Sequence, residues 1–198
     1  MKENYSFLSD EAEGKLIRFG DLVDEASHRF NLIAAGDRER LWTRHLQESM
    51  SPALIQALHP ATTILDIGSG AGFPGIPVAI LRPDSRVALV EPRAKKAAFL
   101  EKVVLALGLS HVRVFPETLE TVARQNPESQ WDQAISRGLR WTPKMVQSLR
   151  SLLTSEGSLL RFGPVSEKNV IMVPVAPGSE RGIQIWRRED WADLVKCL

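Results

Sequence analysis

Apolar residues recur at helical spacing through the first part of the chain. One such series predicts an amphipathic helix that begins at a capping box of Asp10 and Glu13, and its members are Leu16, Phe19, Val23, Ala26 and Phe30. A second helix is expected over residues 41–49. A short third helix is expected from Ser51, which precedes Pro52 as a favourable N-cap, to Leu58. Residues 1–60 are therefore predicted to form a helical cap.

After Pro60 the pattern changes to short apolar runs that alternate with helical segments. Strands are expected at residues 62–67, 86–91, 111–115, 131–136 and 158–162, with helices at 93–107, 117–125 and 142–153. This alternation is typical of a mostly parallel, doubly wound sheet. Two last strands, 169–175 and 182–186, flank a turn-rich segment and predict an antiparallel C-terminal hairpin. We therefore expect an α/β, Rossmann-like core over residues 61–198, forming a single compact unit with the cap.

Composition limits the class of protein. The chain has 198 residues, 43% of them hydrophobic and 25% charged, which suits one compact domain with a sizeable core. Cys197 is the lone cysteine, so no disulfide framework or cysteine zinc site is expected, and the four histidines lack metal-ligand spacing. No apolar run is long enough to span a membrane. We expect a cytoplasmic protein with no membrane contact and no metal.

Charge is unevenly distributed, although the formal net charge is only +1. Residues 1–59 carry 7 Lys/Arg against 10 Asp/Glu, whereas residues 82–150 carry 12 against 7. A basic middle segment is suited to facing phosphates. An evenly solvated surface explains the same counts, so charge alone does not decide between these interpretations.

The central chemical feature is a glycine-rich loop after the first strand. It follows Asp66 and reads Gly68-Ser69-Gly70-Ala71-Gly72-Phe73-Pro74-Gly75. Open parallel sheets bind ligands beyond the carboxyl ends of their strands, and glycine lets the backbone approach a ligand closely. Asp66, at the strand end, is expected to hold a ligand's ammonium group directly or through water. The loop therefore predicts a nucleotide-type site at Gly68, Gly70 and Gly72.

The loop does not decide between two cofactors. Its Gly70-x-Gly72-x-x-Gly75 spacing also satisfies the dinucleotide fingerprint, so NAD is an alternative to S-adenosylmethionine (SAM). Glu91 ends the second strand, where a carboxylate accepts hydrogen bonds from ribose hydroxyls. Both cofactors contain such a ribose, so Glu91 supports a nucleotide without choosing between them.

Several segments, in consistent order from about residue 15 to 163, resemble the RsmG (GidB) ribosomal RNA guanine-N7 methyltransferases. The loop from Asp66 to Pro77 resembles the family's D-x-G-(S/T)-G-x-G-(F/L)-P-G-I-P pattern, which is the most specific element. The other segments are Asn31 to Ala34 (N-L-T-A), Arg44 to Ser49 (R-H-L-x-D-S), Lys96 with Phe99 and Leu100 (K-R-x-x-F-L), and Ile135 to Arg137 (I-S-R-A). The resemblance implies a class I SAM-dependent methyltransferase fold with SAM as cofactor.

The resemblance also implies individual site residues. By position, the family's cofactor contacts fall on Gly68, Phe73, Leu119, Glu120 and Arg137, which join Asp66, Gly70, Gly72 and Glu91. Arg137 is expected to position the reacting groups. Substrate contacts are expected from Asn31, Arg44, His45, Arg140 and Arg161.

The implied reaction is methyl transfer to N7 of a guanine in 16S rRNA, with the small-subunit RNA or the 30S particle as partner of a monomeric enzyme. N7 carries no proton, so no general base is needed, which agrees with the absence of an evident nucleophile–base pair from the sequence. The chain departs from the family at Leu160 to Gly163, where a lysine is usual, at Gly138, and in the short segment 164–168. These departures keep two alternatives open, namely a SAM methyltransferase acting on another RNA or protein, and a non-catalytic RNA-binding relative.

Overall fold

A computed structural model of the chain describes residues 8–30, 32–33, 41–50, 58, 63–163, 170–176, 179–187 and 190–196. The N-terminal part contributes helix α1 (Asp10–Arg29), the π-helical turn η1 (Leu41–Leu46) and the short helix α3 (Gln47–Ser49). The predicted third helix, 51–58, falls on residues outside the described set except for Leu58.

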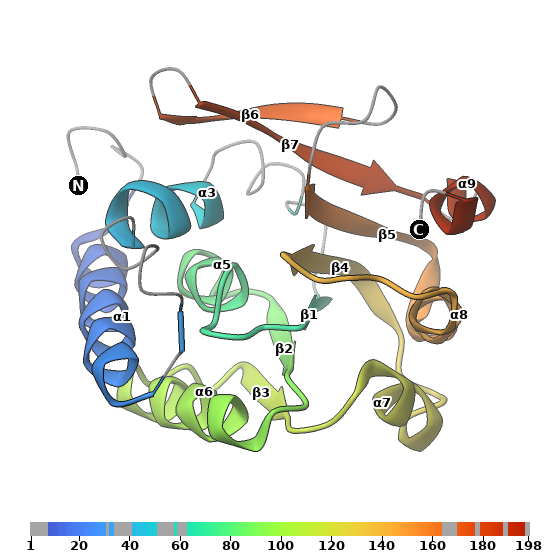
Figure 1. Ribbon diagram of the computed structural model, residues 1–198. Coiled ribbons are helices and arrows are strands. Elements are labelled where there is room, and N and C mark those ends of the chain that lie inside the picture. Colours follow the sequence, from blue (N-terminus) through green and yellow to red (C-terminus); the bar gives the residue numbers. More distant parts are fainter. Residues whose placement is uncertain are drawn as a thin grey trace.

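Seven strands form one sheet in the order β3-β2-β1-β4-β5-β7-β6 (Figure 1). The parallel part comprises β1 (Thr63–Ile67), β2 (Arg86–Val90), β3 (Val112–Phe115), β4 (Trp131–Arg137) and β5 (Leu153–Gly163). The strands β6 (Val170–Ala176) and β7 (Ser179–Trp186) run antiparallel at the edge, with Ala176 opposite Ser179. The expected Rossmann-like sheet with a C-terminal hairpin is confirmed.

Helices cover both faces of the sheet, as Figure 1 shows. On one side lie α1, α5 (Gly75–Leu81) and α6 (Ala94–Ala106), and on the other lie α7 (Leu119–Gln125), α8 (Pro143–Leu152) and α9 (Trp191–Lys196). Each side has its own apolar core, because successive residues of a strand point to opposite faces. In β1, Ile64 enters the core of α1, α5 and α6, whereas Leu65 enters the core of α7, α8 and α9.

Several details differ from the sequence-based expectation. Helix α5 was not among the expected helices, and β7 begins at Ser179 instead of residue 182. The N-cap of α1 is Ser9, whose side chain accepts a hydrogen bond from the Ala12 N–H, so the predicted cap at Asp10 was displaced by one residue. β5 begins at Leu153 instead of Ser158, because an irregularity in the β4–β5 pairing admits the extra residues. The short helix α9 was not predicted, although Trp191 and Leu194 are buried in the second core.

Helix α1 is integrated with the sheet. Its buried Leu16 and Phe19 belong to the same core as Ile76 of α5 and Leu100 of α6. The division into a cap over residues 1–60 and a core over 61–198 remains a prediction.

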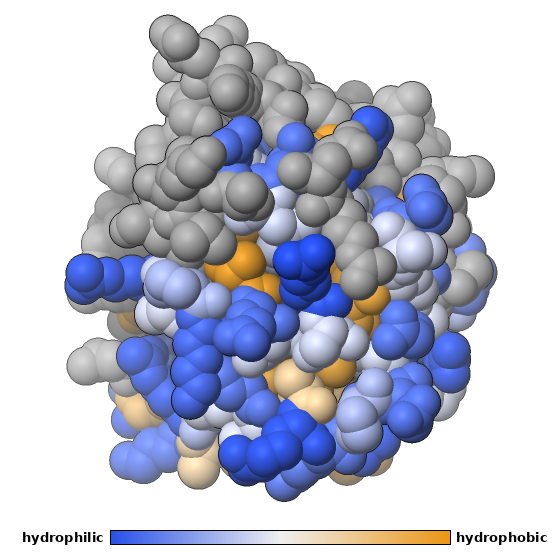
Figure 2. Space-filling model, turned by 90° about the vertical axis from the view of Figure 1, so that its right-hand side faces the viewer, coloured by the Kyte–Doolittle hydropathy of each residue, from blue (hydrophilic) through white to orange (hydrophobic). Residues whose placement is uncertain are grey.

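The side of the molecule that carries α7, α8 and α9 is mostly hydrophilic, with small apolar patches between the polar side chains (Figure 2).

Candidate active site

A cavity of about 550 Å³ lies at the carboxyl ends of β1, β2 and β4. The chain leaves β1 toward β2 and β3, then returns to place β4 on the other side of β1, so the cavity lies at a topological switch point. Its walls come from the loop after β1, the residues after β2, the start of α6, the end of β4 and the N-terminal segment. The volume is within the range of ordinary small-molecule and cofactor pockets.

The floor of the cavity is the glycine-rich loop. Gly68 and Gly70 have φ values of 72° and 57°, the left-handed region that favours glycine. The N–H groups of Gly68 and Ser69 donate to the Val90 carbonyl at 2.9 and 3.1 Å, so the loop is fastened across the end of β2. The predicted close approach of backbone to the ligand space is therefore built into the loop.

Glu91 joins the loop to the second strand. It is 5% exposed and lines the cavity. Its carboxylate accepts one hydrogen bond from the Gly70 N–H and another from the Arg93 N–H, each at 2.9 Å. Each carboxylate oxygen has a second lone pair, so Glu91 keeps acceptor capacity for ribose hydroxyls while it holds the loop in place.

Asp66 lies behind the loop and is fully buried. Because β1 alternates its faces, this side chain points toward α5, where it accepts a hydrogen bond from the Gly75 N–H at 3.2 Å. A Cβ at Gly75 would collide with this carboxylate and with Leu89, so only glycine fits there. Burial raises the pKa of Asp66 to about 7. Asp66 is not among the residues that line the cavity, and its hydrogen bond to Gly75 supports the loop. Its predicted contact to a ligand ammonium, directly or through water, stays a prediction.

Arg137 closes the far side of the cavity at the end of β4. Its Nη1 lies 3.1 Å from Oε2 of Glu48 and 3.4 Å from the His45 carbonyl oxygen, and its Nη2 contacts Nδ1 of the same histidine. The Glu48 side chain is only 1% exposed and that of Arg137 is 15% exposed. A buried ion pair thus links the N-terminal helices to the edge of the sheet that carries the cavity.

Sequence reasoning missed Glu48 as a functional residue. The available signal was its place in the Arg44 to Ser49 segment, three residues after His45 and therefore on the same helical face. Its partner, Arg137, is far away in the chain, so the pairing itself becomes visible only in the fold.

A group of aromatic rings lies between Arg137 and helix α1. The Phe73 ring lies 4.9 Å from the Phe19 ring and 5.5 Å from the His45 ring, measured between centroids. The Arg137 guanidinium carbon lies 5.5 Å from the Phe73 centroid. Phe73 and His45 both line the cavity, so its wall is apolar and π-rich beside a cation.

Lys96 is another cation of the cavity, and it was not among the predicted site residues. Its Nζ donates to the Leu32 carbonyl oxygen at 3.3 Å, which fastens the N-terminal segment to α6 at the cavity. Burial lowers the pKa of this amine, and the neighbouring Glu91 carboxylate opposes that shift.

The structure brings together only part of the predicted site. Gly68, Gly70, Phe73, Glu91, Arg137, His45 and Arg140 line the cavity. Gly72 packs behind the loop against Ile76 and Leu100, and neither Leu119 and Glu120 of α7 nor Arg161 of β5 is among the lining residues. Asn31 and the side chain of Arg44 lie outside the described residues.

Within the described ranges, no three His, Cys, Asp or Glu side chains gather as ligands of a metal ion. None of the described helices is both long and apolar enough to cross a membrane.

Solved structures support the fold. A hypothetical protein from Thermus thermophilus superposes with a TM-score of 0.55 at 17% identity, covering 71% of this chain and 83% of that one. The StiE O-MT structure superposes with a TM-score of 0.53 at 20% identity, covering 68% of this chain and 49% of that one. At these identities the likeness concerns the fold alone.

Sequence comparisons decide the family. The GidB family, rRNA small subunit methyltransferase G, matches residues 12–169. The ribosomal RNA small subunit methyltransferase G of Chromobacterium violaceum is 39% identical over 160 residues, which cover 80% of this chain and 74% of the relative. The protein of the same name from Moorella thermoacetica is 38% identical over 162 residues, which cover 81% and 68%. The chain therefore belongs to the GidB family of SAM-dependent rRNA small subunit methyltransferases G.

Proposed function

We propose that this chain transfers the methyl group of SAM to N7 of a guanine in small-subunit rRNA, with SAM bound in the cavity at the switch point. The supporting observation is the pairing of Glu91 with the glycine loop at 2.9 Å, with Arg137 at the opposite wall. In this proposal Glu91 binds the ribose, the loop backbone binds the amino-acid tail, and Phe73 lies beside the reacting methyl group.

The chemistry asks little of the side chains. SAM supplies a methyl group activated by its sulfonium centre. Guanine N7 is an unprotonated ring lone pair that is free in Watson–Crick pairing, so attack needs no general base. The protein contributes placement, and proximity of this kind is worth about 7–11 kcal/mol in well-oriented reactions. The Phe73 ring and the surrounding walls exclude water and present a π-face to positive charge.

Arg137 is the residue proposed to position the guanine. Guanine O6 accepts hydrogen bonds on the same edge as N7, and a guanidinium is the usual donor to that edge. A contact to O6 would leave the N7 lone pair free for the methyl group. Glu48 is a positioning residue in this proposal, since it acts through Arg137. His45 and Arg140 line the same cavity, and the proposal assigns both of them to contact with the RNA.

The proposal extends to partners and compartment. Because the substrate belongs to the ribosome, we place the enzyme in the cytoplasm, acting as a monomer on stripped rRNA or on 30S particles. Sequence-specific RNA reading mostly targets unpaired loops, where the Hoogsteen edge is open.

The test combines cofactor binding with product identification. Calorimetry should show binding of SAM and of S-adenosylhomocysteine and no binding of NAD. The enzyme is then incubated with methyl-labelled SAM and either 30S particles or stripped rRNA, and the digested nucleosides are identified by mass spectrometry. Label in 7-methylguanosine is expected. Label in another nucleoside or in protein, or binding of SAM with no transfer at all, would favour one of the two alternative functions.

A further inference from the structure

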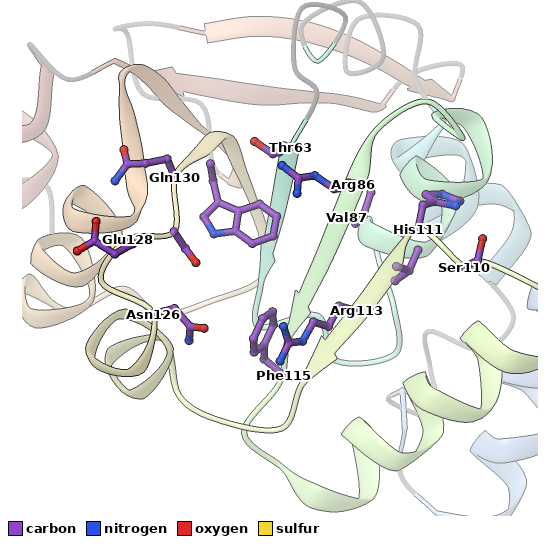
Figure 3. Close-up of a pocket in the computed structure, with 13 residues that line it drawn as sticks. Thr63, Arg86, Val87, Ser110, His111, Arg113, Phe115, Asn126, Glu128 and Gln130 are labelled. Carbon is purple, nitrogen blue, oxygen red and sulfur yellow. The ribbon is translucent and has the colours of Figure 1, made fainter.

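A second cavity, of about 590 Å³, lies mainly at the amino ends of the parallel strands, whereas the cofactor cavity lies at their carboxyl ends. It is bounded by the first residues of β1 and β2, by β3 as far as its last residue, Phe115, and by the segment that leads from α7 into β4 (Figure 3). The two cavities share no lining residue. Along the five residues of β1 they are separated by roughly 16 Å, at about 3.3 Å per residue. At β3 they come closer, because the carbonyl oxygen of Phe115 accepts a hydrogen bond from the Glu91 N–H. The second cavity is therefore distinct from the methyl-transfer site.

The polarity of its floor is unusual for a parallel sheet. Strands covered on both faces are normally apolar throughout. Thr63, Arg86 and Arg113 lie on the same sheet face as Leu65 and Ala88, which are buried in the second core. Helix α7 has seven residues and spans only about 10 Å, which is shorter than the strands it packs on, so it does not cover the whole of this face.

Two arginines in this cavity carry charge that no carboxylate among the described residues neutralises. Arg86 and Arg113 are exposed, and neither takes part in an ion pair within the part of the chain that the structure describes. By contrast, Arg82 of the same basic segment is buried, paired with Asp84 at 3.2 Å, and bound to a carbonyl oxygen. Figure 3 shows Arg86 and Arg113 extending toward the side of the cavity that carries Glu128.

Aromatic surface accompanies these charges. The Arg113 guanidinium lies 4.6 Å from the centroid of the Phe115 ring, and Trp131 forms another part of the lining. The buried indole N–H of Trp131 has no hydrogen-bond partner among the described residues. Cations interleaved with aromatic faces are the pattern by which proteins hold single-stranded nucleic acid, with phosphates on arginine and bases on rings. The one carboxylate in the described lining, Glu128, lies across the cavity from the arginines.

We propose that this second cavity binds a single-stranded nucleotide segment of the rRNA substrate, with its phosphates on Arg86 and Arg113 and a base against Phe115 or Trp131. This inference rests on the proposed function, because it assumes that the substrate is RNA. It also gives a role to the excess of basic residues between 82 and 150, only part of which belongs to the cofactor cavity. A large RNA would thus contact the enzyme both at the carboxyl ends of the strands and at their amino ends.

The test uses the full-length double variant Arg86→Gln/Arg113→Gln, with Arg150→Gln on α8 as a control that removes an exposed arginine outside the cavity. The KM for rRNA should rise about ten-fold or more in the double variant, while kcat and SAM affinity stay unchanged. The slope of log(kcat/KM) against log[salt] should become shallower by about 0.7–0.9 per arginine removed. Phe115→Leu should raise KM without changing the salt slope.

A direct measurement separates this inference from the proposed function. Fluorescence anisotropy with a labelled single-stranded oligoribonucleotide should show weaker binding by the double variant than by the wild type and by Arg150→Gln, whether or not methyl transfer occurs. Equal oligonucleotide affinity, KM and salt slope in the double variant would overturn the second site and leave the methyltransferase assignment intact. Failure of the wild type to methylate RNA, with arginine-dependent oligonucleotide binding preserved, would overturn only the proposed reaction.

Discussion

Replacing Glu48 by Gln tests whether the buried ion pair holds the active site together. At an effective dielectric constant of about 20, two unit charges 3.1 Å apart attract by about 5 kcal/mol. The glutamine keeps the size of the side chain and can still accept a hydrogen bond, and the desolvation cost of the carboxylate disappears. We therefore expect a loss of about 3 kcal/mol in the free energy of unfolding, at the low end for breaking a buried pair.

Urea unfolding at neutral pH measures this loss directly. For a chain of this size, about 3 kcal/mol corresponds to a decrease in Tm of about 6–12 °C. A double-mutant cycle with Arg137→Met isolates the pair, and a coupling energy of at least about 1.5 kcal/mol is expected. A cost below about 1 kcal/mol for Glu48→Gln, with the two substitutions additive, would refute a stabilising role for the pair.

The same variant also tests catalysis, because a purely structural role of Glu48 would leave the kcat of the folded enzyme unchanged. Since Glu48 orients the guanidinium, Glu48→Gln should lower kcat on rRNA at temperatures where the variant is fully folded, with a smaller effect on SAM affinity. Glu48→Asp restores the charge and the residue type usual in the family's motif, so it should recover part of kcat. Equal kcat in Glu48→Gln and wild type would remove Glu48 from the positioning role.

Three further predictions concern the cofactor loop and its support. Because the folded pKa of Asp66, about 7, exceeds its ordinary value of 3.8, the folded state holds this proton more tightly, and stability should fall by about 4 kcal/mol as pH rises from about 4 to above 7. Asp66→Asn should remove that contribution in urea unfolding at several pH values, and an unchanged pH dependence would contradict the assignment. Gly70→Val should abolish SAM binding in calorimetry while circular dichroism stays native-like. Its matched control is Gly108→Val, which has a similar φ of 63° in a remote turn and should bind SAM normally. Glu91→Gln should weaken SAM binding about ten-fold or more, or about 1.4 kcal/mol, and unaltered affinity would exclude the ribose contact.

Local pattern was sufficient for most of the fold. Most strands and helices between residues 62 and 163 follow from apolar periodicity, because a residue's spacing decides which face of an element it occupies. Helix α5, whose residues are almost all buried, has no such periodicity and was not among the predicted helices. The loop from Gly68 to Gly72 was also readable, since positive φ values demand glycine whatever surrounds them. Family motifs in the sequence then pointed to SAM, which periodicity and the loop alone did not separate from NAD.

Tertiary structure decided which of these residues meet. Asp66 stood beside the loop in the sequence, yet the alternation of β1 turns it into the core beneath α5. Arg137 and His45, 92 residues apart, come into contact only when the N-terminal helices pack over the end of β4, and Glu48 acquires its partner in the same step. The register of β2 and β3, together with the shortness of α7, likewise determines that Arg86 and Arg113 share a cavity. Periodicity fixes the direction of a side chain within its own element, whereas the groups it contacts depend on how distant elements pack.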